Sequence, residues 1–469
     1  MPKHIAIIGG GPAGYVAASH AAAEGARVTL IDPHPLGGTC LHRGCIPTKT
    51  LVEVCNLLEK MRRAETYGLR LNGSIEADWP AMRAKAGQVI GLLNRGIDGL
   101  MADRKVTPVQ GRGRVVDGRH VDVPGHGMVE ADAVLVCTGS SPIRPASFQV
   151  DGERIATSDE LLKWDTLPSS LLIVGDGVVA CEFAFIMHTL GVQVTLAAMA
   201  ERPLPFLDRD IAAVVQREMR KLGIEFIGRC QVERLEATPD GVAAYADGQL
   251  AATAERALVA VGRRPQSTGL GLLMRTNLAG LYAVGDVNGR LALAHAASAQ
   301  ARLAVNHALG LDPAPLNEAA IPWAVFTMPE IGCVGLAEQD AVDQGHVVSC
   351  GADPPGRHRA CHHPNRARPS HSVGSAAGSR RGCARPGRAQ THETREAQPC
   401  QHIILKTASI TATPSGCSAW KGTKPCWGST ISRSRAWARS YSWTCRGWAL
   451  PFARIPPSVP SNPTRPCPT

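Results

Sequence analysis

The chain has 469 residues, of which 44% are hydrophobic and 19% charged, so it is long enough for two to four domains with a sizeable core. Its first residues run directly into an apolar strand without a signal-peptide pattern, and no apolar run reaches membrane-spanning length. We therefore expect a soluble, cytoplasmic protein without a membrane partner.

The net charge of +10 is concentrated at one end of the chain. Residues 349–469 hold 18 Lys and Arg but only 3 Asp and Glu, whereas the residues before them are net acidic. A positive balance spread over a whole molecule would indicate an anionic partner such as nucleic acid. This distribution does not, so we expect no nucleic-acid partner.

The first predicted element is a strand over His4–Ile8 that leads into a glycine turn and a helix. The turn has the pattern Gly-x-Gly-x-x-Gly at Gly9, Gly11 and Gly14, and Asp32 ends the next predicted strand. Such glycines let the backbone approach a pyrophosphate at the helix N-terminus, and the acid takes a ribose hydroxyl. The alternative is a tight turn, but strand, helix and acid together predict a dinucleotide site.

The next segment carries Cys40 and Cys45. In a straight helix their Cα atoms would lie roughly 8–9 Å apart, and a disulfide needs less than about 7 Å. The backbone must therefore bend for a disulfide, and Gly44 and Pro47 supply places to bend. A helix start stabilises a thiolate, and Lys49 adds its charge one turn later. Chance cysteines, buried thiols or half a metal site are the alternatives, but zinc needs a second pair, so we predict no metal.

A second apolar strand leads into another glycine turn, formed by Gly175, Gly177 and Ala180. The acid expected after the following strand is missing, because Ala198 occupies its position. Arg202 lies nearby, and an arginine can hold a 2′-phosphate. This pattern predicts a second dinucleotide site with NAD or NADP; the alternative is a structural turn. Strand–turn–helix units of this kind indicate parallel sheets and an α/β fold.

Regular patterning ends near residue 348. Residues 354–388 show no apolar period, and residues 349–469 contain 5 of the 8 Trp and 8 of the 15 Cys. A natural disordered tail is polar and poor in aromatic residues. The scattered cysteines do not form the spaced framework of a secreted protein. We interpret 349–469 as an unpatterned basic tail, typical of a GC-rich gene translated out of frame.

The sequence GGTCLHRGCIPTK at residues 37–49 resembles the redox segment of the class I pyridine nucleotide-disulfide oxidoreductases, and most of all that of the dihydrolipoamide dehydrogenases. The resemblance stops near residue 348 and covers about three quarters of the chain. Other stretches that carry it are NRGIDGLMADRKV at 94–106, CTGS at 137–140, VGRRP at 261–265, AVGDV at 283–287, LAH at 293–295 and IPWAVFTMPEIGCVGLAE at 321–338.

This resemblance implies an enzyme that passes electrons from dihydrolipoamide to a Cys40–Cys45 disulfide, then to FAD and then to NAD⁺, with NADP not excluded. Cys40 would be the interchange thiol and Cys45 the charge-transfer thiol at the flavin. Lys49 would lie near flavin N5, paired with Glu182; an exposed helix carboxylate is the alternative for Glu182. Asp286 would bind the ribityl chain, or be a turn residue. Further positions implied in cofactor binding are Thr39, Gly113, Gly139, Gly262, Arg263 and Ala294.

The resemblance also implies a domain order. An FAD domain would comprise residues 1–145 and 265–315, and an NAD(P) domain residues 146–264, both Rossmann-like. Residues 316–348 would be what remains of an α+β dimerisation domain. The substrate would be dihydrolipoamide on a 2-oxo acid dehydrogenase complex. The family is homodimeric, but a truncated interface domain argues against a dimer here.

Two departures from the family pattern leave alternatives open. The family ends with a His and, five residues later, a Glu, which act in the partner's site; no His here has a Glu at that spacing. Neither His362-His363-Pro364 nor His392 with Glu396 fits. A connection between Leu273 and Arg275 is also shortened. The alternatives are a catalytically impaired flavoprotein or pseudogene product, and another disulfide reductase of glutathione or mercuric type.

Overall fold

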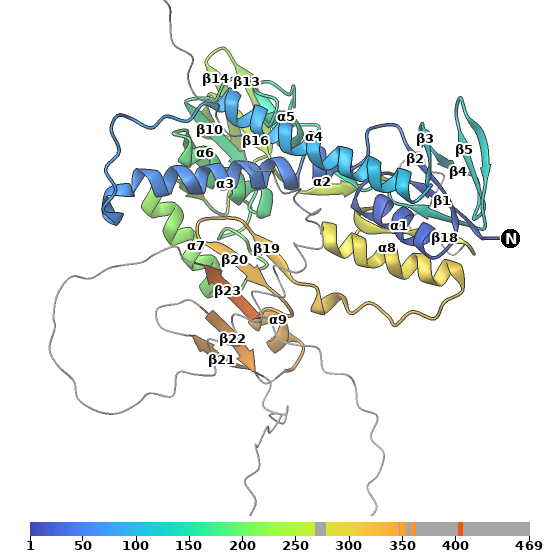
Figure 1. Ribbon diagram of the computed structural model, residues 1–469. Coiled ribbons are helices and arrows are strands. Elements are labelled where there is room, and N and C mark those ends of the chain that lie inside the picture. Colours follow the sequence, from blue (N-terminus) through green and yellow to red (C-terminus); the bar gives the residue numbers. More distant parts are fainter. Residues whose placement is uncertain (268–277, 347, 353–357, 363–401, 407–469) are drawn as a thin grey trace, which may run out of the picture. The chain divides into compact units, whose positions relative to one another are not determined.

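The computed structural model describes residues 1–267, 278–346, 348–352, 358–362 and 402–406. Within these residues, two five-stranded parallel sheets and one five-stranded antiparallel sheet organise the chain (Figure 1). The predicted α/β fold with parallel sheets is therefore confirmed. The shortened connection between Leu273 and Arg275 lies outside the described residues, as do His363, Pro364, His392 and Glu396.

The first parallel sheet is built around an N-terminal strand that is buried along its whole length. Such a continuous apolar run is typical of a parallel strand covered on both faces. The last strand of this sheet comes from beyond residue 280, so the chain leaves the sheet and returns to complete it. The strands, in spatial order, are β18 (Leu281–Ala283), β7 (Ala133–Val136), β1 (His4–Ile8), β2 (Arg27–Asp32) and β3 (Thr107–Gln110).

Helices α1 (Pro12–Ala23) and α8 (Ala294–Leu309) pack together over one face of this sheet. Ala17 and Ala18 of α1 and Ala301 of α8 have no exposed surface. These small side chains bring the helices close to each other and to the strands. A small antiparallel sheet shares a core with the opposite face. It consists of β4 (Arg114–Val115), β5 (His120–Val123) and β6 (Gly127–Glu130).

The second parallel sheet repeats the strand–turn–helix plan of the first. Its central strand is followed by α6 (Val178–Thr189), where Phe183 and Phe185 are fully buried. The strands, in spatial order, are β12 (Glu225–Ile227), β11 (Gln193–Ala197), β10 (Ser170–Val174), β16 (Arg256–Val259) and β9 (Ile155–Thr157). Neighbouring elements are α5 (Ser158–Leu161), α7 (Arg209–Leu222), β13 (Arg234–Thr238), β14 (Gly241–Ala246) and β15 (Gln249–Ala254).

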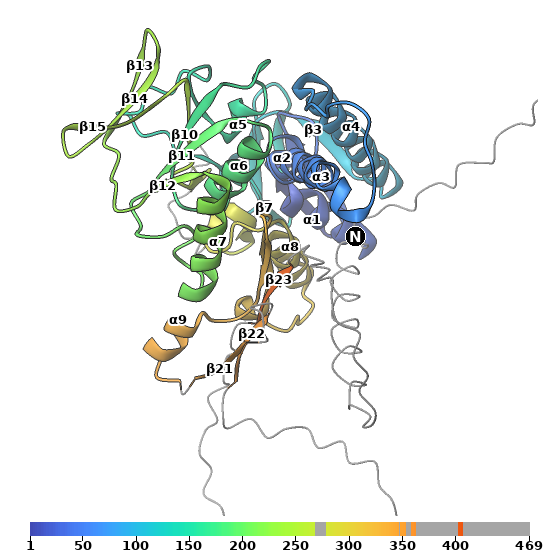
Figure 2. The same cartoon turned by 90° about the vertical axis from the view of Figure 1, so that its left-hand side faces the viewer.

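Three helices join the two parallel sheets. The short α2 (Gly38–His42) is followed by α3 (Cys45–Arg62), and α4 (Trp79–Asp103) lies beside α3 (Figures 1 and 2). Buried side chains of α3 share one hydrophobic core with those of α6. At the start of α4, the indole of Trp79 donates a hydrogen bond to the carbonyl of Trp164 at 2.7 Å. Helix α3 is thus packed against α6 and α4.

The antiparallel sheet corrects one expectation from the sequence. We predicted no regular element after residue 348, yet three strands of this sheet lie there. Strands pair through their backbone groups, so these strands do not require the long periodic pattern of apolar residues that this segment lacks. Only the apolar residues at 403–405, in the last strand, were a local sequence signal. The strands, in order, are β19 (Trp323–Val325), β20 (Glu330–Cys333), β23 (His402–Lys406), β22 (His358–His362) and β21 (Ser349–Ala352), and α9 (Glu338–Asp343) follows β20 in the chain.

Strands β8 (Ser140–Pro142) and β17 (Arg263–Pro265) form a two-stranded ribbon. It pairs the segment that leads into the second parallel sheet with the segment that leaves it. The domain boundaries that we predicted stay predictions, although β18 joins the N-terminal sheet.

In the part of the chain that the structure describes, no helix is long and apolar enough to cross a membrane. Short 3₁₀ helices cover Ala64–Tyr67, Gly285–Asn288 and Glu318–Ala320.

The first glycine turn gives a test of the fold. A Cβ atom on Gly14 would lie 1.7 Å from the carbonyl oxygen of Gly9. We expect Gly14→Ala to force the turn apart and to lower the free energy of unfolding by roughly 3 kcal/mol or more. Gly99→Ala, in α4, is the control, because a Cβ there meets nothing within 4 Å. It should raise stability by about 0.5–1 kcal/mol. Urea unfolding followed by circular dichroism measures both, and equal stabilities would contradict the expectation.

Candidate active site

The first glycine turn is shaped for an anionic group. Gly9 has a φ of +105° and packs against the backbone of Cys137, so a side chain there would be strained as well as blocked. Helix α1 begins after Gly11 with no side-chain cap and no acid in its first turn. Its first N–H groups therefore lack side-chain partners, which is the arrangement that binds phosphate at a helix N-terminus. The residues fit the predicted FAD pyrophosphate.

Asp32 is fixed at the end of β2 by backbone amides. The N–H of Gly10 donates to one of its carboxylate oxygens at 2.5 Å, and the N–H of His34 donates to the other at 2.7 Å. Each oxygen retains a second lone pair. The carboxylate is thus oriented beside the glycine turn. The sequence predicted that it binds a ribose hydroxyl there, and that role stays a prediction.

The second glycine turn has the same form but different surroundings. Gly175 has a φ of +139° and packs against the carbonyl of Ala260, and α6 begins after Gly177 without a side-chain cap. Ala180 is fully buried within α6. These residues fit a second dinucleotide in the same way.

The side chains beyond β11 distinguish the two turns. Ala198, at the position of the expected acid, is buried. Arg202 donates hydrogen bonds to the carbonyls of Pro205 and Leu207, at 2.9 and 3.2 Å. Its guanidinium is therefore engaged by its own loop. This engagement weighs against the 2′-phosphate role that the sequence left open.

The chain bends between the two cysteines, as the sequence required, but at one place only. Cys40 lies in α2 and Cys45 is the first residue of α3, with Gly44 between the helices in a non-helical conformation. Pro47 was predicted as a second bend and is not one, because it lies in the first turn of α3. A proline is tolerated there, since its missing N–H would have no helical partner anyway.

Both cysteines are free thiols in the structure, and they interact through a hydrogen bond between their side chains. This hydrogen bond, together with the positive charge of Lys49, lowers the pKa of Cys45 to about 7 against the opposing effects of desolvation and of Glu182, although the Cys45 side chain reaches the surface. The same hydrogen bond and burial hold the pKa of Cys40 well above its usual value. In the reduced pair, Cys45 therefore loses its proton more readily than Cys40.

Lys49 and Glu182 form a close ion pair between α3 and α6. The ammonium of Lys49 donates to both carboxylate oxygens of Glu182, at 2.9 and 2.8 Å. Glu182 is only 3% exposed, so it is not the exposed helix carboxylate of the alternative interpretation. The predicted pairing of these two side chains is present; the place of Lys49 beside a flavin stays a prediction.

Two residues that the sequence analysis did not single out also belong to this site. The N–H of Phe326 donates to Glu182 at 3.0 Å, and the Phe326 ring lies 4.7 Å from the Lys49 ammonium. Tyr15 is buried in α1 near both cysteines. Burial raises its pKa most, and negative charge on either cysteine raises it further. Phe326 has no local pattern that marks it, whereas Tyr15 lies one residue after the glycine turn.

Several residues predicted to contact a cofactor form a network around Ser140. The hydroxyl of Ser140 donates to Asp286 at 2.6 Å, and the guanidinium of Arg263 donates to the same hydroxyl at 2.9 Å. Arg263 therefore joins β17 to β8, which is a structural role beside the predicted binding role. Of the other predicted positions, Thr39 lies in α2 and Ala294 begins α8. Gly113 packs against Ile8 and Val121. Gly139 and Gly262 have positive φ angles. Their contacts with a cofactor stay predictions.

The remaining described cysteines differ from the redox pair. Cys55, Cys137, Cys181, Cys230 and Cys333 are buried and are therefore core thiols. Burial raises the pKa of Cys55 and of Cys333 to about 12, so neither is ionised near neutral pH. Among the residues that the structure describes, no three potential ligands cluster in a way that could hold a metal ion.

Comparison with known proteins agrees with this arrangement. Residues 3–301 match the family described as pyridine nucleotide-disulphide oxidoreductase. The chain is 39% identical to a dihydrolipoyl dehydrogenase of Bacillus subtilis, over 72% of this chain and 78% of that protein.

Among solved structures, LpdA from Mycobacterium tuberculosis is similar, with 27% identity and a TM-score of 0.72 over 86% of this chain and 90% of that one. The HOCl-induced flavoprotein disulfide reductase RclA from Escherichia coli shares the fold, with a TM-score of 0.70 at 22% identity, over 87% of this chain and 90% of its own.

The acidity of Cys45 can be tested by two substitutions of opposite effect. Because Lys49 lowers the pKa of Cys45 and Glu182 raises it, Lys49→Met should move the midpoint of Cys45 alkylation upward from about pH 7. The shift should be about one pH unit. Glu182→Gln should move the midpoint downward. The rate of iodoacetamide alkylation of the reduced protein across pH, followed by mass spectrometry, measures both.

Lys60→Met, at an exposed position of α3, is the control for this test and should leave the midpoint unchanged. The same midpoint in all variants would show that the ion pair does not act on Cys45.

Proposed function

The chain belongs to the pyridine nucleotide-disulphide oxidoreductases, and we propose that it oxidises dihydrolipoamide with NAD⁺ through Cys40 and Cys45. It is an oxidoreductase, and FAD and NAD are its cofactors. The observation that carries the proposal is the asymmetric thiol pair beside the Lys49–Glu182 ion pair. The similarity to dihydrolipoyl dehydrogenases supports the choice of substrate.

The residues present would hold the two dinucleotides at the two glycine turns. The uncapped start of α1 and Asp32 would bind FAD, and the uncapped start of α6 would bind NAD. When bound, FAD supplies a group that accepts two electrons from thiols and passes them on as a hydride to NAD⁺. The protein supplies the orientation of these groups and the electrostatics around them.

The thiols have separate roles in the proposed reaction. Cys40 exchanges with the substrate, while Cys45, held as a thiolate beside Lys49, lies on the cofactor side. Overall, dihydrolipoamide loses two electrons and two protons and becomes a cyclic disulfide. NAD⁺ takes up a hydride, and one proton is released. The Cys40–Cys45 disulfide is reduced and reformed in each cycle.

The substrate side leads to a second candidate function. In the proposed direction, a substrate thiol must lose its proton to attack the Cys40–Cys45 disulfide, and Cys40 takes up a proton when the substrate disulfide closes. The charged groups that act on Cys40 are Cys45, Lys49 and Asp286. None of these is a histidine suited to act as a base. The second candidate is therefore a flavoprotein that transfers electrons from NADH to other acceptors and turns over lipoamide poorly.

The dihydrolipoamide would be carried by a 2-oxo acid dehydrogenase complex, which is the partner that this substrate implies. The family name alone does not select that partner over a small disulfide. Glutathione disulfide is accordingly the comparison substrate in the assay below.

The assay compares two electron routes in the purified, FAD-containing chain. We expect NAD⁺-dependent oxidation of dihydrolipoamide, and loss of this activity by about 10³-fold or more in Cys40→Ser and in Cys45→Ser. NADH oxidation with an artificial acceptor should survive in both variants, because that route does not need the thiols.

Each outcome of this assay separates the candidates. A wild-type chain that reduces the artificial acceptor but not NAD⁺ from dihydrolipoamide would contradict the lipoamide proposal and support the second candidate. Faster turnover of glutathione disulfide than of lipoamide would replace the proposed substrate.

The choice of nicotinamide cofactor is tested at Arg202. We expect kcat/KM to be higher with NAD⁺ than with NADP⁺, because the guanidinium is held by two loop carbonyls. Arg202→Ala should change the ratio of kcat/KM with NAD⁺ to kcat/KM with NADP⁺ by no more than about twofold. If Arg202 does not contact the 2′-phosphate, its removal cannot weaken the binding of NADP⁺. A variant that loses mainly its activity with NADP⁺ would show that Arg202 binds the 2′-phosphate.

A further inference from the structure

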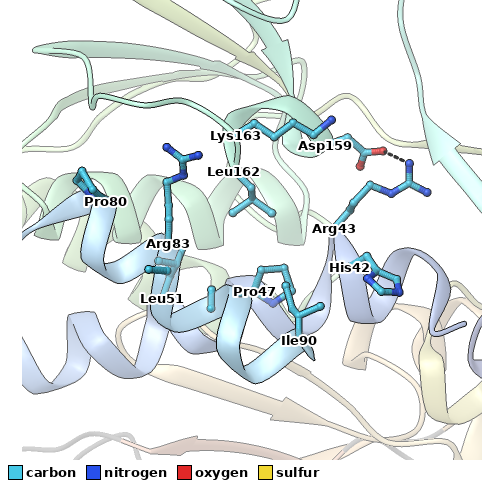
Figure 3. Close-up of a pocket in the computed structure, with 13 residues that line it drawn as sticks. His42, Arg43, Pro47, Leu51, Pro80, Arg83, Ile90, Asp159, Leu162 and Lys163 are labelled. Atoms are coloured by element: carbon cyan, nitrogen blue, oxygen red, sulfur yellow. Dashed lines mark ion pairs between the residues drawn. The ribbon is translucent and has the colours of Figure 1, made fainter. Parts of the chain in front are cut away.

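A pocket of about 470 Å³ opens beside the redox segment, outside both glycine turns (Figure 3). Its wall includes Arg43, which lies between the two cysteines, and residues of α3 and α4 and around α5. Its volume is in the range of ordinary small-molecule sites. None of its lining residues belongs to either dinucleotide turn or to the Lys49–Glu182 pair.

One part of the pocket is apolar. Pro47 and Leu51 contribute from α3, Ile90 from α4 and Leu162 from the end of α5. In Figure 3, Leu162 points from α5 toward the side chains of α3 and α4. Gly87 of α4 also lines the pocket, and a Cβ there would meet no atom within 4 Å. Side chains from three helices thus leave apolar space that an apolar body could fill.

The rim of the pocket is cationic. Arg83 is anchored, because it donates to the carbonyl of Trp164 and to Asp165, at 2.7 and 2.9 Å. Lys163 is exposed, and its ammonium has no partner among the described residues. Arg43 lies opposite Asp159 with its side chain 43% exposed. Arg83 is paired with Asp165, which lies outside the pocket lining. The rim therefore leaves Arg43 and Lys163 around the one carboxylate that lines it, Asp159.

That carboxylate is only partly satisfied. One oxygen of Asp159 lies 3.6 Å from the Arg43 guanidinium, which is an ion pair longer than a hydrogen bond. Its other oxygen, Oδ1, is buried and has no hydrogen-bond partner. Buried polar atoms without partners are uncommon, because they cost the free energy of their lost hydration. Because Oδ1 has no surface open to the pocket, a donor supplied by a ligand would reach Oδ2, which has the ion pair with Arg43 but no hydrogen bond among the described residues.

We propose that this pocket binds an amphipathic organic anion, with a carboxylate head on the Arg43, Arg83 and Lys163 side, a hydrogen-bond donor toward Asp159 and an aliphatic body over Leu51 and Ile90. The charge of the rim selects an anion over an amine. The apolar part selects a chain of several carbons over acetate. Asp159 Oδ2, which has no hydrogen bond within the described part of the chain, selects a hydroxyl beside the carboxylate. This ligand is distinct from the disulfide substrate and from both dinucleotides.

Calorimetric titration of the full, FAD-containing chain with four probes tests the ligand class. We expect 2-hydroxyoctanoate to bind about threefold to tenfold more tightly than octanoate, because the added hydroxyl satisfies Asp159. Octanoate should bind more tightly than octan-1-ol, and octylamine should not bind. Equal binding of octylamine and octanoate would overturn the proposal, and so would binding that does not depend on the head group.

A pair of substitutions in one helix places the ligand in this pocket. Gly87→Leu fills the space that Gly87 leaves open, and it should weaken binding of 2-hydroxyoctanoate at least tenfold. Gly99→Leu makes the same change in the same helix at an exposed position where a Cβ also meets nothing, and it should leave the affinity within about twofold. Equal affinities in the two variants would place the ligand elsewhere and overturn the assignment.

A second pair tests the charge of the rim without changing the shape of the pocket. Lys163→Gln should weaken binding by about threefold to fivefold, the effect of one exposed charge contact. Lys60→Gln removes an exposed lysine from the far part of α3 and should have no effect. Because these titrations measure binding, they can fail while the lipoamide assay succeeds, or succeed while it fails. An unchanged affinity in Lys163→Gln would contradict the proposed head-group position.

Discussion

The ion pair between Lys49 and Glu182 joins helices α3 and α6 and, through Phe326, the antiparallel sheet. Lys49 lies in the helix that begins at the redox cysteines, and Glu182 lies in the helix that follows the second glycine turn. The backbone of Phe326, just after β19 of the antiparallel sheet, donates to the same carboxylate. Glu182 is almost fully buried while its partner is a third exposed. Loss of Lys49 would leave a buried charge unpaired, which costs far more than the pair itself contributes.

The same ion pair contributes to the difference in acidity between the two thiols. Its lysine stabilises the negative charge of Cys45, and its glutamate opposes that stabilisation, so the acidity of Cys45 depends on the balance of the two. Cys40 receives no comparable help, because its hydrogen bond to Cys45 and its burial keep it protonated. The described site is therefore prepared for electron exchange on the cofactor side. On the substrate side, it needs a base that the groups around Cys40 do not provide.

The bend at Gly44 has two consequences. It brings Cys40 and Cys45, from two separate helices, within hydrogen-bonding reach, and it turns the side chain of Arg43 toward Asp159 near α5. Residues 40–45 thus carry both redox cysteines and two residues of the pocket wall, His42 and Arg43.

The sequence by itself determined the features that depend on local sterics. The glycine turns, the strand before each turn, the position of Asp32 and the bend between the cysteines follow from residues within one strand–turn–helix unit. The sequence also placed the Lys49–Glu182 pair, but only through resemblance to a family, because these residues are 133 positions apart. It failed at Pro47, which a helix start accepts, and beyond residue 348, where strands pair through backbone groups.

The tertiary structure alone decided which side chains meet across such distances. Phe326 joins Glu182 from 144 positions away, Arg263 is engaged by Ser140, and Arg202 is held by its own loop. The pocket combines residues between positions 42 and 163. None of these contacts leaves a periodic or local pattern, because each depends on how whole elements pack against one another.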